Sequence, residues 1–289
     1  MHPVHHTAVP APTAARALAA ALLAFVACVS AREPALPARP SSAMPMPGAT
    51  CCAVVELRQY TLHPFKRDVL IDLFEREFVE SQEAAGIRLV GTFRDLGNPD
   101  RFVWLRGFAG MPARRDALRA FYEGPAWQAQ RDTANATMID SDNVLLLRQL
   151  QAGTGFPTDH RALAPRDAVA IPPGLVEARL LYLPTLPTPA QRALAASMGA
   201  LQEQAGATPL AAFATEPAQN SFPRLPVREG ESVLAWFAQF ADRAAYERYL
   251  AALARSPRWQ AAMGRLGEDA PRAPDILLLS PTARSRLPL

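Results

Sequence analysis

The sequence contains the stretch Val103-Trp104-Leu105-Arg106-Gly107-Phe108 and, in related form, the stretch Leu234-Ala235-Trp236-Phe237-Ala238-Gln239-Phe240. A second tryptophan follows the first by 23 positions in both cases, as Trp127 and as Trp259. Each of these stands two residues after a proline, which is favoured at the first position of a helix. The shared spacing predicts an internal duplication of one unit, a strand followed by a broken helix.

Residues 53–150, which include the first tryptophan stretch at 103–108, have the sequence pattern of a complete α+β unit. Apolar and polar residues alternate over 54–62, which predicts a strand. Leu70, Phe74 and Phe78 lie four apart and predict an amphipathic helix over 67–85. The other expected elements are strands over 87–96, 101–108 and 142–150 and a helix over 112–139 that Gly124-Pro125 interrupts. The order β-α-β-β-α-β is that of the ferredoxin-like unit, with helices on one sheet face.

A second unit of the same order is expected over 174–281, after a linker over 151–173 that is rich in Gly, Pro and Asp. The hairpin at 216–230 is about 12 residues longer than its counterpart at Asn98-Pro99. The uncovered faces of the two sheets would be too apolar for water, so we expect them to close on each other. The predicted fold is therefore α+β, with tandem ferredoxin-like (β-α-β-β-α-β) repeats forming an α/β barrel.

The N-terminal residues 1–31 have the pattern of a secretory signal. Arg16 precedes an apolar run over 17–29, which is too short to span a bilayer, and small residues at 29–31 suit a cleavage site. A Pro-rich linker over 32–52 follows. We therefore predict an exported or periplasmic protein with no membrane span in the mature chain. The alternatives are a cytoplasmic protein that starts at Met44 and a lipoprotein anchored through Cys28.

Composition excludes some classes of function. The chain has a net charge of +3 and no Lys/Arg block, which argues against a nucleic-acid partner. Three cysteines without a CxxC motif do not predict a disulfide framework or a thiolate zinc site, so no metal site is expected. Cys51 and Cys52 are adjacent, and neighbouring residues rarely reach a relaxed disulfide geometry, so we predict two unpaired thiols.

Polar side chains share one face of the first strand, because residues alternate between the two faces: Glu56, Arg58 and Tyr60. Trp104 and Arg106 are expected beside them on the neighbouring strand. All five side chains are expected to face the barrel interior, which is where we expect a cavity. A guanidinium beside a carboxylate and a phenol can bind an anionic or carbonyl-bearing ligand, or hold an aromatic one against the indole. The alternative is an internal salt bridge between Glu56 and a buried arginine.

The first unit is the better candidate for a site. The second unit keeps Glu177 and Arg179 in phase, but the uncharged Gln239 replaces the neighbourhood of Arg106. His63 ends the first strand and is either a general base at the barrel mouth or a surface histidine. No catalytic residue is identified. The candidate ligand-binding residues are Glu56, Arg58, Tyr60, His63, Trp104 and Arg106.

Three stretches resemble the NIPSNAP family, whose domains belong to the dimeric α/β-barrel superfamily: Val55–Leu62, Asp100–Phe108 and Phe121–Trp127. The resemblance is specific over 53–150 and weaker over 174–280. It implies a ferredoxin-like barrel, and it brings no settled catalytic residues. A small-molecule ligand, a protein partner and a homo-oligomer all stay open, because the sequence does not specify the oligomeric state. Mitochondrial members are discussed as adaptor or trafficking proteins, while cousins in the superfamily include cofactor-free monooxygenases and haem enzymes. Haem needs an axial ligand, and neither His63 nor His160 is on a predicted barrel-facing helix, so no cofactor is expected.

Three functions remain open from the sequence. The first is a barrel that binds a small apolar or aromatic ligand, or a protein partner, without catalysis. The second is a cofactor-independent monooxygenase or isomerase that acts in the barrel pocket of the first repeat, an analogy from the superfamily. The third is a filled barrel with no ligand, for which Trp104 is structural.

Overall fold

Strands from both halves of the chain form one sheet of nine strands in this computed structural model, which describes residues 50–158 and 162–288. Their order is β3-β2-β9-β6-β8-β7-β5-β1-β4, and an additional pairing of β3 with β1 closes all but β4 into an antiparallel barrel. The strands are β1 (Val54–Leu62), β2 (Arg88–Asp95), β3 (Arg101–Phe108), β4 (Met138–Asp140), β5 (Val144–Gln149), β6 (Leu175–Leu183), β7 (Thr208–Thr215), β8 (Ser232–Phe240) and β9 (Asp275–Pro281).

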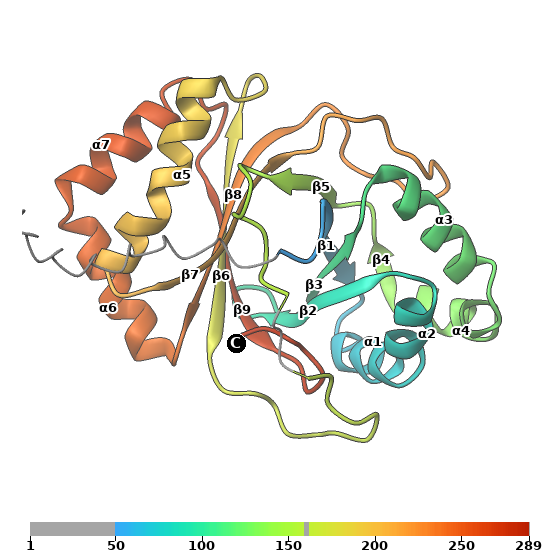
Figure 1. Cartoon of the computed structure of the whole chain (residues 1–289). Coiled ribbons are helices and arrows are strands. Elements are labelled where there is room, and N and C mark those ends of the chain that lie inside the picture. Colours follow the sequence, from blue (N-terminus) through green and yellow to red (C-terminus); the bar gives the residue numbers. More distant parts are fainter. Residues whose placement is uncertain (1–49, 159–161, 289) are drawn as a thin grey trace, which may run out of the picture. The chain divides into compact units, whose positions relative to one another are not determined.

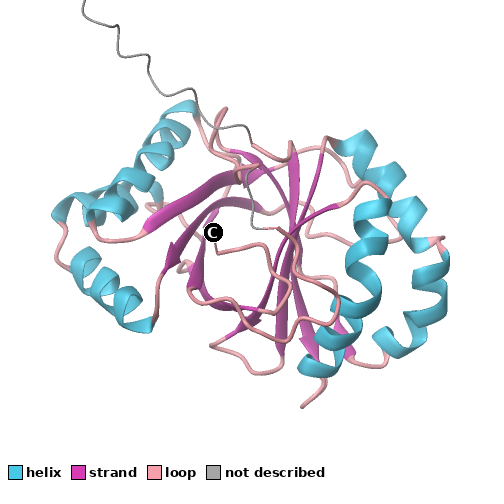
Figure 2. Ribbon diagram, turned by 60° about the horizontal axis from the view of Figure 1, so that its bottom comes forward, coloured by secondary structure: helices cyan, strands magenta, loops and turns pink. Residues whose placement is uncertain are grey.

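The helices lie outside the strands in two groups, one for each half of the chain (Figures 1 and 2). The first group consists of α1 (Arg67–Leu73), η1 (Phe74–Phe78), α2 (Val79–Ala84), α3 (Met111–Tyr122) and α4 (Pro125–Asn135). The second consists of α5 (Pro189–Gln204), α6 (Arg243–Ala254) and α7 (Pro257–Leu266). The predicted breaks before Trp127 and Trp259 are present, with a proline at the start of α4 and of α7.

The helix expected over 67–85 contains a π-helical segment, η1, that the sequence did not predict. A π-helical turn takes in an additional residue and is frequent at functional sites. Here it buries the neighbouring side chains Phe74 and Glu75 together with Phe78. Phe74 and Phe78 pack in the aromatic core beneath the helices, while Glu75 accepts hydrogen bonds from the side chain of Thr282 and the backbone N–H of Arg284.

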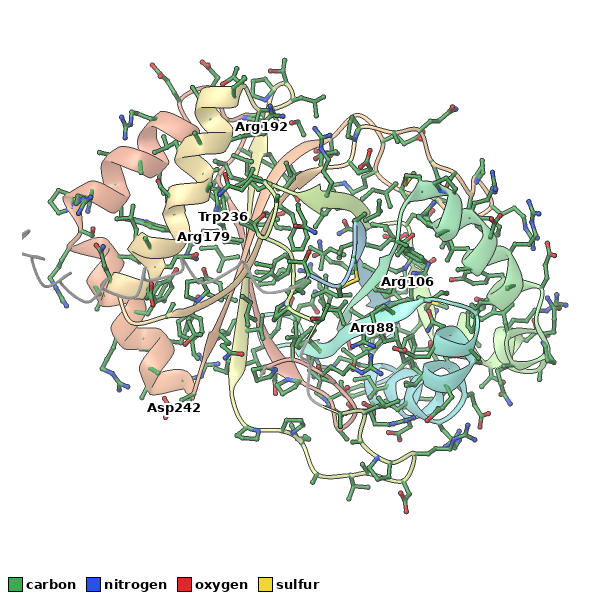
Figure 3. All side chains as sticks on the ribbon, viewed as in Figure 1. Arg88, Arg106, Arg179, Arg192, Trp236 and Asp242 are labelled. Carbon is green, nitrogen blue, oxygen red and sulfur yellow. A yellow bond between two sulfur atoms is a disulfide. The ribbon has the colours of Figure 1, made fainter. Side chains whose placement is uncertain are left out.

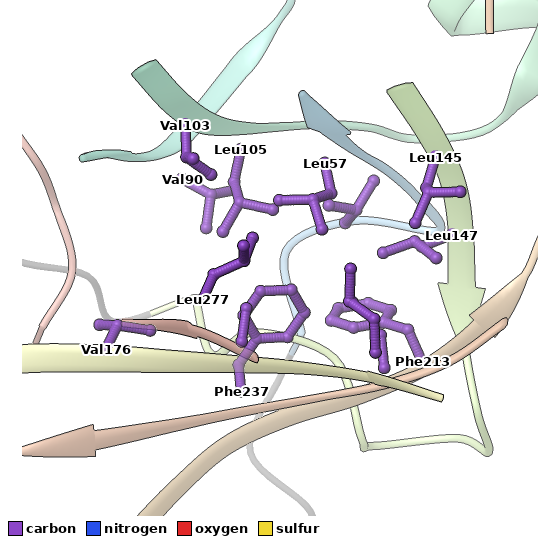
Figure 4. Close-up of a cluster of buried hydrophobic side chains, with 14 of the residues drawn as sticks. Leu57, Val90, Val103, Leu105, Leu145, Leu147, Val176, Phe213, Phe237 and Leu277 are labelled. Atoms are coloured by element: carbon purple, nitrogen blue, oxygen red, sulfur yellow. The ribbon is translucent and has the colours of Figure 1, made fainter. Parts of the chain in front are cut away.

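The barrel interior is filled by apolar side chains, among them Leu57, Leu105, Phe213 and Phe237 (Figure 4). This corrects the expectation of a cavity inside the barrel. The predicted alternation is right, but its direction is wrong: Tyr60 and Trp104 belong to the core under the helices, as do their neighbours on the same strand faces. Both faces of β1 and β3 are apolar enough to be buried, so alternation alone could not tell which face the helices cover.

Two segments outside the strands close the structure. The chain after β9 is buried, and Leu287 lies in the core of the barrel, beyond the expected end of the second unit at residue 281. Cys51 and Cys52 form a disulfide, which corrects the prediction of unpaired thiols. They precede β1 in an irregular turn, and they therefore escape the alternation that would point adjacent strand side chains to opposite faces. The predicted signal over 1–31 and its alternatives at Cys28 and Met44 lie outside the described residues.

Candidate functional site

Glu56 is the centre of a buried ion cluster between the sheet and the first group of helices. It lies directly across from Arg106 on the neighbouring strand, and its Oε2 is 2.6 Å from Arg106 Nε and 2.8 Å from Arg58 Nη1. Its other oxygen, Oε1, is 2.6 Å from Nε of Arg114 on α3. The side chains of all four residues are 0% exposed. The structure thus brings three predicted residues together and adds a third arginine.

Arg114 could have been found from helical periodicity. The buried residues of α3 follow the spacing i, i+3, i+4, i+7 and i+8, and Arg114 occupies the first position of this otherwise largely apolar stripe. A charged residue in such a stripe indicates a buried partner, because an unpaired charge is costly to bury. Gln82 on α2, which accepts a hydrogen bond from Arg106 Nη1 at 3.1 Å, carried a weaker signal of the same kind.

Aromatic rings line a small cavity beside this cluster. Its volume is about 30 Å³, and its walls come from β1, β3, β4 and all the helical segments of the first half: Tyr60, Leu70, Phe74, Phe78, Gln82, Trp104, Phe121, Tyr122, Trp127, Ala134 and Met138. The Arg106 guanidinium lies 4.9 Å from the Trp104 ring and 5.9 Å from the Tyr122 ring. Arg58 Nε donates to the Tyr60 hydroxyl at 3.0 Å. The arginines therefore lie behind one wall of an aromatic cavity.

The long β7–β8 loop of the second half also reaches this site. Arg114 Nη1 donates to Asn220 Oδ1 at 2.9 Å and to Ser221 Oγ at 3.1 Å. Phe222 is buried and stacks on Tyr122, with ring centroids 6.1 Å apart and planes 21° apart. The additional length of this hairpin was visible in the sequence, but its contact with the first half was not, because more than 100 residues separate Arg114 from Asn220.

Burial and charge shift the ionisation of this cluster. Burial alone would raise the pKa of Glu56, but Arg106, Arg58 and Arg114 together hold this pKa well below its ordinary value. Burial raises the pKa of Tyr60 to about 12 despite the opposing effect of Arg58, so the phenol is neutral at physiological pH. Burial also lowers the pKa of Arg114, although Glu56 opposes the shift. The site therefore holds one carboxylate and a neutral phenol among three guanidinium groups.

The depressed pKa of Glu56 predicts an acid-sensitive fold. A carboxyl whose pKa is lower in the folded state contributes stability that is present above its unfolded pKa, here 4.5, and is lost as pH falls below it. We expect the free energy of unfolding, measured with urea between pH 6 and pH 3, to fall more steeply for the wild type than for Glu56→Gln. Equal slopes for the two proteins would contradict the assignment.

The second half contains a related but neutral arrangement. Glu177 Oε1 and Oε2 pair with Arg179 Nε and Nη2 at 3.0 and 3.1 Å, and Ala238 lies across from Glu177 on β8. The residue in the place of Arg106 is therefore Ala238, which corrects the expectation that Gln239 replaces it. Trp236 Nε1 donates to the Ala195 carbonyl at 2.9 Å. Figure 3 shows Arg179 and Trp236 beside α5, on the other side of the strands from Arg106.

His63 is not part of the cluster. It is exposed in the loop after β1, and no interaction of its imidazole is found among the described residues. The other histidine after the predicted signal, His160, lies outside them. Across residues 50–158 and 162–288, no group of three or more His, Cys, Asp or Glu side chains is arranged to hold a metal ion. No helix in that part of the chain is long and apolar enough to cross a membrane.

Comparisons with known proteins agree with this architecture. Residues 55–151 match the model of the NIPSNAP family, which confirms the resemblance seen in the sequence. No curated protein sequence matches the chain significantly. A NIPSNAP family protein from Agrobacterium tumefaciens is 23% identical over 33% of this chain and 91% of its own, with a TM-score of 0.31.

A solved structure also aligns with most of the chain. An anthrone oxidase-like protein is 14% identical over 81% of this chain and 94% of its own, with a TM-score of 0.50. A NIPSNAP-like domain protein from Burkholderia xenovorans is 24% identical over 39% of this chain and 90% of its own, with a TM-score of 0.31. At 14% identity the first likeness supports the barrel fold and carries no activity to this chain.

Proposed function

We propose that the NIPSNAP domain binds a small aromatic molecule between its helices and strands β1 and β3. The observation that carries this proposal is the cavity lined by aromatic rings, in which two buried donors, Trp104 Nε1 and Gln82 Nε2, have no hydrogen-bond partner among the described residues. Buried polar groups are nearly always paired, so these two indicate a ligand acceptor. An aromatic ring suits the remaining walls, because rings pack edge-to-face and offset against one another.

Binding requires the cavity to widen. A volume of about 30 Å³ accommodates roughly one water molecule and no aromatic ring. Trp127, like Met138, is a half-buried part of the wall, and its ring lies 4.9 to 5.9 Å from the rings of Phe78, Phe121 and Tyr122, measured between centroids. The π-helical segment η1 supplies the facing rings Phe74 and Phe78. Movement of Trp127 outward would open the cavity without disturbing the barrel.

Replacing Trp127 by alanine is expected to strengthen the binding of 2-naphthol by at least about tenfold, because the ring then occupies the space of the indole. Isothermal titration calorimetry on the full chain measures this effect. Trp259→Ala is the matched control, since Trp259 has the same place in the second half and packs near Arg179. A gain of equal size in both variants, or no 2-naphthol binding in any of them, would overturn the proposal.

The second candidate is a cofactor-independent oxygenase or isomerase in the same site. Its support is that the unpaired groups are all donors, which stabilise the anion formed when a substrate loses a proton. Glu56 is engaged by three arginines and Tyr60 is held neutral, so the substrate would have to be acidic itself.

Oxygenation in this second candidate would convert a methylene and dioxygen to a carbonyl and water. One oxygen atom takes the place of the two hydrogens on the methylene carbon, and the other oxygen atom leaves with those hydrogens as water. Consumption of oxygen with anthrone, lost in Arg58→Met while the fold is kept, would favour this candidate. A rate that Arg58→Met leaves unchanged would count against it.

We further propose that the two halves, 53–150 and 174–281, arose by duplication. Both contain a Glu-Arg pair two residues apart on their first strand and a tryptophan on the paired strand. We also propose that the chain is exported, which a disulfide between Cys51 and Cys52 suits, because disulfides persist in oxidising compartments. Binding of a protein partner and self-association stay open proposals, and size-exclusion chromatography with light scattering tests the second.

A further inference from the structure

We propose that the ligand of this site carries an anionic oxygen, a carboxylate or phenolate attached to an apolar ring, and that Arg58, Arg106 and Arg114 bind it. This inference rests on the proposed aromatic site and specifies its ligand class. The ring would lie among the aromatic side chains of the helices, and the oxygen would lie near Trp104 Nε1. Because the three arginines lie behind this wall and do not line the cavity, the cavity must also widen toward their Nη2 groups for the oxygen to reach them.

The charges in the cluster do not balance. Three guanidinium groups surround a single carboxylate, and all four side chains are 0% exposed. The other hydrogen-bond partners of the arginines are neutral: Gln82, Asn220, Ser221 and the phenol of Tyr60. Two positive charges therefore lack a counter-ion among residues 50–158 and 162–288, and a buried charge without one is strongly unfavourable. An anion with one or two charges would compensate them.

The unpaired hydrogen-bond donors of the cluster also favour an anionic ligand. In the part of the chain that the structure describes, five buried side-chain nitrogens of this site have no hydrogen-bond partner: Nη2 of Arg58, Arg106 and Arg114, Gln82 Nε2 and Trp104 Nε1. All five are donors. The acceptors of the cluster are occupied, since Glu56 uses both oxygens, Gln82 Oε1 accepts from Arg106, and Asn220 Oδ1 accepts from Arg114. A ligand that satisfies this site must accept several hydrogen bonds, which is the property of an oxyanion.

The corresponding Glu-Arg pair of the second half has no excess of positive charge and serves as a comparison. There, Glu177 forms two bonds to one arginine, Ala238 stands where an additional arginine would be, and Trp236 Nε1 has a backbone acceptor. None of the side-chain atoms of Glu177, Arg179 or Trp236 is found buried without a partner. The additional arginines and unpaired donors are therefore confined to the first half, where the cavity is aromatic.

The test uses pairs of probes with nearly the same shape that differ in charge: formate and formamide, acetate and acetamide, benzoate and benzamide. The smallest pair needs little widening of the cavity. Affinities are measured at pH 7 by calorimetry and by the rise in melting temperature of the full chain. We expect each acid to bind at least about tenfold more tightly than its amide, as charge-assisted hydrogen bonds require. Arg106→Met should reduce this preference severalfold, whereas Arg115→Met, which removes an exposed arginine of the same helix as Arg114, should leave it unchanged.

The outcomes separate the two proposals. Acids and amides that bind the wild type equally well would overturn the inference of an anionic ligand and leave the aromatic site standing. Failure of benzoate, benzamide and 2-naphthol alike to bind would overturn both. A preference for acids that Arg115→Met reduces as much as Arg106→Met would also overturn the inference, because it would reflect the net charge of the surface. The comparison on the wild type needs no variant to fold.

Discussion

Replacing Glu56 by glutamine is expected to lower the free energy of unfolding by about 3–5 kcal/mol, because removal of one partner leaves buried charges without compensation. Three arginines would then face one another at 0% exposure without any carboxylate among them. The shape of the side chain is retained, so the loss measures charge and not packing. Urea unfolding at pH 7, followed by circular dichroism, gives the number.

Arg106→Met is the informative partner of that variant. It removes one of the two uncompensated charges and gives β3 an uncharged residue at the place that Ala238 occupies on β8. In the absence of ligand, Arg106→Met should lower the free energy of unfolding far less than Glu56→Gln does. The double variant with both substitutions should be more stable than Glu56→Gln alone. If Arg106→Met proves as costly as Glu56→Gln, the cluster is a balanced structural network, and the charge argument for a ligand fails.

Replacing Trp104 by alanine is expected to lower the free energy of unfolding by about 3–5 kcal/mol, the usual loss when a buried aromatic residue is replaced by alanine. Trp104 is 2% exposed and packs against Phe74 at a centroid distance of 4.8 Å and against Tyr60 at 5.8 Å. Phenylalanine retains most of this packing. Because Trp104 Nε1 has no hydrogen-bond partner in the described structure, Trp104→Phe loses no bond, and its cost should come only from the smaller volume of the side chain.

The matched control for Trp104→Phe is Trp236→Phe. Trp236 is equally buried, but its Nε1 donates to the Ala195 carbonyl, which would lose this donor in the variant. We therefore expect Trp236→Phe to be more destabilising than Trp104→Phe by about 1–3 kcal/mol, the cost of a buried group left unsatisfied. Thermal and urea unfolding measure both. Equal costs would mean that Trp104 Nε1 has an acceptor in solution when no ligand is bound.

Much of the architecture followed from local sequence patterns. The paired tryptophans at a fixed spacing, the alternation over Val54–Leu62 and the prolines before Trp127 and Trp259 predicted strands and broken helices that the structure contains. The same alternation placed Glu56, Arg58 and Tyr60 on one face of β1. It placed Trp104 and Arg106 on the same face of the neighbouring strand β3, and the structure brings all five together. These features depend on the residue periods of strands and helices, which a sequence displays directly.

Other features arise from contacts between segments that are distant in the sequence. The direction of the polar face was one such feature, because both faces of β1 and β3 are buried. Arg114 bonds to Glu56, Gln82 to Arg106 and the β7–β8 loop to Arg114, all between residues far apart in the sequence. No local sequence pattern therefore shows how many charges surround the one carboxylate. Local periodicity in the sequence is enough to specify the helices and strands and which residues share a face. The charge imbalance at Glu56 arises only when β1, β3, α3 and the β7–β8 loop pack together, since burial and pairing are properties of that packing.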